Sequence, residues 1–175
     1  MKKSFVFYIL LSVFASLGIL QAQDEEKKEV KRPKNIGVAD YDNFKNNSFD
    51  VLDESKSLLE NVTHIDNEIK GYSGIMNTIG VEKLKKNLTA LTESKSSVEI
   101  LLKKIGELAE TGQGLLTNVK SVSPKTKSLS ASKNTKTSIS GLDTSKGNLT
   151  DLSNLLVADI TLVTDALKSK GEIIE

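Results

Sequence analysis

The chain has 175 residues, no cysteine, 24 basic and 23 acidic residues, and therefore a formal net charge of +1. This near-neutral balance argues against a basic protein that coats nucleic acid. The missing cysteine excludes disulfides, thiol catalysis and sulfur-ligated metal sites. Hydrophobic residues make up 38% of the chain, which suits a lean core.

The first 22 residues have the features of a signal peptide. Lys2 and Lys3 form a positive start, residues 5–20 carry no charge, and Ala22 is a small residue suited to the position before a cut. A membrane anchor would need about 20 apolar residues, so we expect cleavage, which leaves 153 residues with 22 basic and 23 acidic side chains. Plentiful asparagine and a single arginine, Arg32, favour a bacterial source. We therefore expect a protein exported to the periplasm or out of the cell.

Residues 23–37 differ from the rest of the chain in their charge. They carry nine charged side chains, and Val30 and Ile36 are their only aliphatic residues. Burying so little apolar surface does not offset the entropy lost on ordering. This composition predicts a charged flexible tether.

From Val38 onward, an apolar residue recurs every three or four positions, which indicates helices. The pattern predicts an all-α fold: a single domain over 38–175, forming an elongated up-down-up bundle of three long coiled-coil-like helices near 40–70, 81–122 and 139–170. Glycines at 71, 74 and 80 mark the first turn, and Ser123 with Pro124 marks the second. Leu129 is the only large apolar residue between 128 and 138, so the pattern leaves open whether 123–138 is helix or loop.

The second expected helix has the most regular apolar pattern. Steps of four and three residues from position 84 meet an apolar side chain at nine of eleven positions, a seam typical of a coiled coil about 60 Å long. The eleven residues are Leu84, Leu88, Leu91, Lys95, Val98, Leu102, Ile105, Ala109, Gly112, Leu116 and Val119.

Charge is distributed unevenly between the first and third expected helices. Residues 35–70 hold eight acidic residues and three lysines, whereas residues 120–147 hold six lysines and Asp143. In an up-down-up bundle these segments lie side by side, and their attraction would favour that topology. The alternative is that both are solvated faces whose asymmetry has no role, since exposed ion pairs contribute only about 0 to 1 kcal/mol each.

No catalytic set can be assembled from the sequence. The only histidine, His64, has Glu60 and Glu68 four residues to either side, so a helix would place all three on one face. One imidazole supplies too few ligands for a closed metal site, and position 64 lies off the apolar stripe, so we interpret this face as solvated. The same interpretation holds for a second acidic cluster, Asp50, Asp53 and Glu54. We expect no catalytic residue, cofactor or metal, and no enzyme.

After the predicted leader the chain has four aromatic residues, and none follows Tyr72. So few aromatic side chains argue against a grip on sugars or single-stranded nucleic acid. Tyr41, Phe44 and Phe49 lie close together near the start of the first expected helix. They could fill the end of the bundle, because aromatic residues bury the most area, or they could form a partner-docking patch.

These observations favour an exported, non-enzymatic helical protein that acts through protein contacts or self-association in the bacterial envelope or outside the cell. We infer no nucleic acid, no specific small molecule, and no membrane binding after the leader is removed. Two alternatives are a periplasmic helical chaperone and an amphipathic protein that binds lipid or membrane surfaces. The helix faces are narrow and rich in serine and threonine, which argues against the second alternative.

Overall fold

The structure, a computed structural model, describes residues 30–173, so the predicted leader and residues 23–29 of the predicted tether lie outside it. The chain divides into two units, Met1–Val30 and Lys31–Glu175, and the features below belong to the second. Its three long helices are α2 (Ala39–Tyr72), α3 (Val81–Asn118) and α4 (Lys125–Ser169). Short 3-10 helices η1 (Ser73–Thr78) and η2 (Val119–Ser121) lie in the turns. The described part contains no strand, which confirms the predicted all-helical fold.

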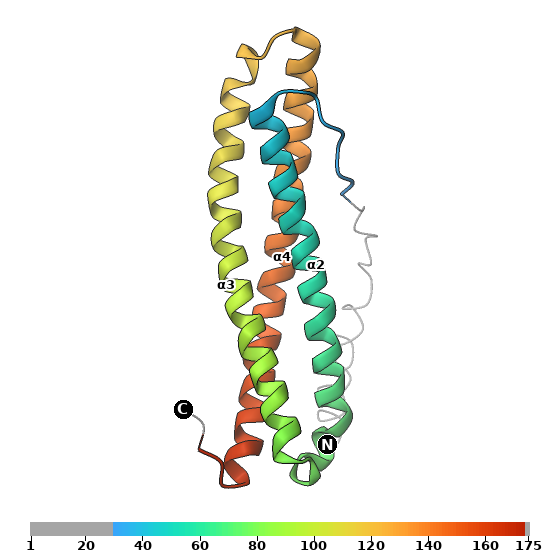
Figure 1. Cartoon of the computed structure of the whole chain (residues 1–175), viewed down its shortest axis with the longest axis vertical. Coiled ribbons are helices and arrows are strands. Elements are labelled where there is room, and N and C mark those ends of the chain that lie inside the picture. The colour runs from blue at the N-terminus through green and yellow to red at the C-terminus, as the bar shows by residue number, and fades with distance from the viewer. Residues whose placement is uncertain (1–29, 174–175) are drawn as a thin grey trace, which may run out of the picture. The chain divides into compact units, whose positions relative to one another are not determined.

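The helices pack against one another in an up-down-up order. Figure 1 shows α2 and α4 running in the same direction and α3 running the opposite way. Each of α2 and α3 packs extensively against α4, and they pack less extensively against each other. This difference leaves the α2–α3 side of the bundle the more open one.

The third helix begins earlier than the apolar pattern indicated. It starts at Lys125 rather than near 139, so the segment that the sequence left open is helical almost throughout. The backbone amides of Lys127 and Ser128 donate to the Pro124 carbonyl oxygen at 2.9 and 3.2 Å, closing the first turn. The buried residues of this early part are small, among them Ala131, which explains the missing apolar stripe.

The core follows a heptad-like spacing on each helix. Buried residues of α3 recur every seven positions at Leu84, Leu91, Val98, Ile105 and Gly112. On α4, buried residues alternate by steps of four and three over eleven positions. These are Ala131, Thr135, Ser138, Leu142, Ser145, Leu149, Leu152, Leu156, Asp159, Val163 and Ala166. Two kinds of core therefore lie along one helix, small and hydroxyl-bearing at the start and mostly leucine further on.

Residues 31–37, here called the N-terminal strap, lead into α2. The carboxylate of Asp42 accepts hydrogen bonds from the backbone amides of Ile36, Gly37 and Val38 at 2.8, 2.8 and 3.2 Å. Gly37 has a φ of +72°, a left-handed conformation that glycine adopts without steric cost. Asp42 thus supplies the acceptor for the amides of Ile36 and Gly37, which precede α2, and for that of Val38 at its N-cap.

Side chains also attach the strap to the helices beside it. Arg32 pairs with Asp50 at 2.7 Å and with Asp53 at 2.9 Å, both on α2. Asn134 of α4 donates to the carbonyl oxygen of Lys34 at 2.9 Å. Composition suggested a flexible tether over 23–37; these polar contacts, rather than apolar burial, attach its last residues to the bundle.

Candidate functional site

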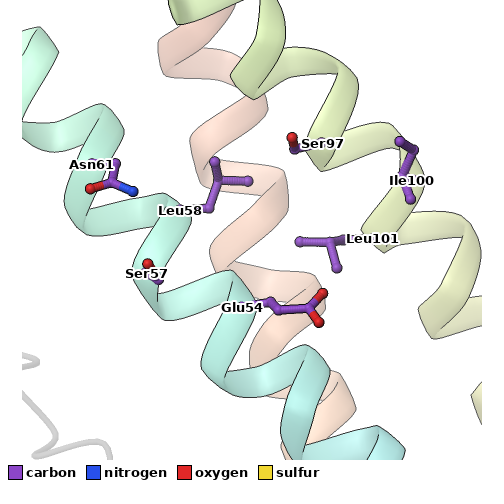
Figure 2. A pocket seen from close by; sticks show the side chains of 7 residues that line it. All are labelled: Glu54, Ser57, Leu58, Asn61, Ser97, Ile100 and Leu101. Carbon is purple, nitrogen blue, oxygen red and sulfur yellow. The ribbon is translucent and has the colours of Figure 1, made fainter.

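A groove lies between α2 and α3, with a volume of about 370 Å³. It is lined by Glu54, Ser57, Leu58 and Asn61 from α2 and by Ser97, Ile100 and Leu101 from α3. Figure 2 shows Leu58 and Leu101 extending from the two helices into the space between them. Most of the lining residues on each helix lie three or four positions apart, so each helix presents one continuous face to the groove.

The groove combines an apolar floor with a polar rim. Leu101 is almost fully buried, whereas Ile100 beside it is 64% exposed. Serine and asparagine side chains border the aliphatic ones, and Glu54 lies 3.7 Å from Lys104. A groove with an apolar centre and a polar edge is the kind of surface that receives an amphipathic helix. Its lining contains no histidine that could activate a serine.

Two carboxylates face the interior in the C-terminal halves of α2 and α4. Asp66 of α2 is 4% exposed and Asp159 of α4 is 5% exposed. The Lys70 ammonium donates to Asp66 Oδ2 at 2.7 Å, while Asp66 Oδ1 and Asp159 Oδ2 are buried without a hydrogen-bond partner in the described part of the chain. Buried polar atoms without partners are rare and destabilising.

The environment of Asp159 changes its acidity. Burial raises the pKa of Asp159 above its ordinary value, the negative charge of Asp66 raises it further, and Lys70 opposes the shift. Asp159 therefore retains its proton at a pH at which a solvated aspartate has lost it. Within residues 30–173, no group of three or more histidine, cysteine or acidic residues is placed to hold a metal ion.

A polar network connects the end of α2 with the start of α3. Asn87 of α3 donates to the hydroxyl of Tyr72, whose pKa is raised mainly by burial. Lys83 pairs with Glu68 at 2.8 Å and lies 5.1 Å from the centre of the Tyr72 ring. The hydrogen bond from Lys83 is the main cause that lowers the pKa of Glu68. Glu68 is thus engaged in a contact between α2 and α3.

The sequence predicted that the helix face around His64 is exposed to solvent. His64 and Glu60 are exposed, and Glu68 pairs with Lys83 of the next helix. In the second acidic cluster, Asp50 and Asp53 hold Arg32 of the strap, and Glu54 borders the groove. Several of these acidic side chains therefore make structural ion pairs.

The three aromatic residues considered as a docking patch are buried. Tyr41, Phe44 and Phe49 are 5%, 2% and 2% exposed. Tyr41 donates its hydroxyl to the carbonyl oxygen of Leu115 at 2.9 Å. A Cβ placed on Gly112 would lie 2.7 Å from Phe44 Cζ, so this ring packs directly on the α3 backbone. Phe49 lies beneath the Arg32 guanidinium, 5.6 Å from ring centre to Cζ. In the folded bundle these rings are covered, as expected if they fill the end of the bundle, and their role as a docking patch stays a prediction.

Sequence reasoning missed both the groove and the buried acids. It assigned Leu102 to the seam, whereas Leu101 is the more buried of the two leucines. Asp159 falls three residues after Leu156 and four before Val163, on the buried seam, and this spacing was the available signal.

No family model, curated protein or solved structure matches this chain. None of the helices in the described range is long and apolar enough to cross a membrane.

Proposed function

We propose that this chain is an exported, non-enzymatic helical protein that acts through protein–protein contacts in the bacterial envelope or outside the cell, and that the α2–α3 groove receives an amphipathic helix of its partner. The observation that carries the proposal is the exposed Ile100 beside the apolar floor of this groove. A large aliphatic side chain that is mostly exposed at the edge of a concave surface gains free energy when a partner covers it.

The chemistry of the groove favours a helix over an extended peptide. Side chains of α2 and α3, both helices, form its two walls, and no strand edge in the described residues offers backbone hydrogen bonds. Apolar residues of a partner helix, spaced three or four positions apart, would contact Leu58, Ile100 and Leu101. Ser57, Asn61 and Ser97 would then satisfy polar groups at the rim.

Sequence features support both export and contact between helices. The positive start at Lys2 and Lys3 and the uncharged residues 5–20 favour export. The seven-residue recurrence of buried side chains from Leu84 to Gly112 supports coiled-coil-like character, which suits helix-to-helix association.

Site-specific photo-cross-linking in the source cell tests the proposal. A photoreactive amino acid at position 100 should capture one dominant, saturable partner. The matched control is position 129 on α4, because Leu129 is also an exposed aliphatic residue, at 74%. Position 129 should not capture that partner, and Ile100→Glu should weaken binding about tenfold or more without loss of helicity, whereas Leu129→Glu should not.

Three outcomes would contradict the proposal. The same spread of many unfolded proteins at both positions would replace it with chaperone activity. Self-links alone at position 100 would make the groove a homotypic contact. Turnover of a defined substrate by the purified protein would make the chain an enzyme.

A further inference from the structure

A second hollow, about 610 Å³ in volume, lies between the N-terminal strap and α4. Its lining includes Lys31, Arg32 and Lys34 from the strap and Ser130, Lys133 and Thr137 from α4. The strap runs alongside α4 here because Asn134 donates to the Lys34 carbonyl oxygen and Lys127 donates to that of Gly37, at 2.9 and 3.3 Å. Segments about 100 residues apart in the sequence thus form one concave surface.

Three of the four positive charges in this hollow are uncompensated. Its lining holds four cationic side chains and no carboxylate. Arg32 is neutralised by Asp50 and Asp53, but within residues 30–173 no ion pair involves Lys31, Lys34 or Lys133. The acidic face of α2 therefore does not neutralise these three lysines through direct contacts. Ammonium groups around one concavity focus a positive potential that attracts anions.

Two buried polar side chains line the hollow or contact a residue that lines it. Asn134, which lines the hollow, is 9% exposed and is held by its bond to the strap. Lys45 of α2 is 2% exposed and donates to Asn35, another lining residue. No ion pair between described residues involves Lys45, so its partner is neutral. A cation buried against a neutral acceptor is costly, and an anion in the hollow would offset part of that cost.

Two hydroxyl groups add further hydrogen-bond donors to the hollow. Ser130 and Thr137 lie on the α4 side of the hollow, and neither hydroxyl bonds to another described residue. A phosphate group offers three or more acceptor oxygens and up to two negative charges, so it can accept from several lysines and a hydroxyl at once. A carboxylate offers only two oxygens, which would leave donors in this hollow without partners.

We propose that the hollow between the N-terminal strap and α4 is a binding site for a phosphate-bearing anion, with Lys31, Lys34 and Lys133 as charge donors and Ser130 and Thr137 as hydroxyl donors. The anion is either a free diphosphate or the phosphate group in the headgroup of an anionic phospholipid. This site is separate from the α2–α3 groove, and it does not depend on the function proposed for that groove.

Calorimetric titration of the purified protein with inorganic pyrophosphate tests the free anion, and flotation with phosphatidylglycerol vesicles against phosphatidylcholine vesicles tests the headgroup. Binding of pyrophosphate, of the anionic vesicles, or of both is the expected result and identifies the source. Lys34→Gln with Lys133→Gln should weaken binding about tenfold or more. The control pair, Lys86→Gln with Lys103→Gln, removes the same charge from exposed positions on α3 and should change affinity less than about twofold.

The proposal is overturned if neither pyrophosphate nor anionic vesicles bind at low ionic strength. It is also overturned if both double variants lose affinity equally, because the binding then reflects overall charge and not this site. Far-UV circular dichroism of each variant separates loss of binding from loss of fold.

Discussion

The two ends of the bundle fill their interiors by opposite means. Where α2 begins, Tyr41, Phe44 and Phe49 are buried, and the Phe44 ring lies against Gly112, which has no side chain. Towards the other end, leucines from α3 and α4 pack around Val62 and Ile69 of α2. The comparison shows that one helical spacing accommodates two kinds of core packing. At one end a large side chain packs against a residue without one, and at the other end side chains of medium size pack against one another. Only the leucine-rich packing is visible in the sequence as an apolar stripe.

The largest expected effect comes from removing the aromatic side of this arrangement. Phe44→Ala should lower the free energy of unfolding by about 3–5 kcal/mol, because the ring is buried and Gly112 has no side chain to fill the space. Chemical denaturation measures it. Ile100→Ala, an exposed site at the edge of the α2–α3 groove, is the control and should cost less than about 1 kcal/mol. A similar cost at both sites would mean that Phe44 does not anchor this end.

Gly112→Ala tests the same contact from the other helix. Its Cβ would lie 2.7 Å from Phe44 Cζ and 3.1 Å from Ile139 Cγ1, so we expect a loss of about 1–2 kcal/mol in the free energy of unfolding, despite alanine's better helix propensity. Gly106→Ala is the matched control on the same helix. Nothing lies within 4 Å of its added Cβ, so it should stabilise the protein by about 0.5–1 kcal/mol.

A double-mutant cycle sharpens this prediction. In the Phe44→Ala background the clash at Gly112 is relieved, and Gly112→Ala should become neutral or stabilising. If Gly112→Ala costs the same in both backgrounds, the ring and the glycine are not in energetic contact.

At the leucine-rich end, Asp159→Asn should raise the free energy of unfolding at neutral pH by about 1 kcal/mol, because it removes a charge from a buried site without a full set of partners. The pKa of Asp159 is raised in the folded protein by burial and by Asp66, against Lys70, so the folded state binds its proton more tightly than the unfolded state does. Its contribution to stability is therefore present at low pH and decreases as pH rises from the ordinary pKa of 3.8 through the raised value.

Denaturation curves at several pH values measure this effect as the difference between wild type and Asp159→Asn. Asp143→Asn, an exposed site on the same helix, makes the same charge change and should alter the free energy of unfolding at neutral pH by less than about 0.5 kcal/mol. A parallel pH dependence in wild type and Asp159→Asn would mean that the buried carboxylate does not titrate in this range.

The smallest expected effect lies at the surface of the aromatic end. Arg32→Gln removes two exposed ion pairs and the cation above the Phe49 ring, which should cost about 0.5–1 kcal/mol. Hydrogen exchange of the Ile36 and Gly37 amides should stay slow, because Asp42 still holds them. Faster exchange at these amides would mean that Arg32, rather than Asp42, fixes the strap.

The sequence predicted the three helices and their order because large apolar residues repeat every three or four positions. It left the first turns of α4 undecided between helix and loop, because the buried residues there, Ala131, Thr135 and Ser138, form no stripe of large apolar side chains. It could not find the α2–α3 groove, which depends on how far apart the helices lie. It also could not distinguish the buried Asp66 and Asp159 from the exposed acidic residues, because an aspartate is expected to lie in solvent on the basis of residue type alone.

The contacts of the N-terminal strap bear on where a shortened chain can begin. Removing residues up to Gly37 would uncover the Phe49 ring and take Asn35 away from Lys45, leaving a buried ammonium group without its acceptor. The helices alone are therefore not the smallest intact unit. A truncation series that begins at Lys31 and proceeds towards Gly37 should lose stability in steps, even though each step removes only irregular chain.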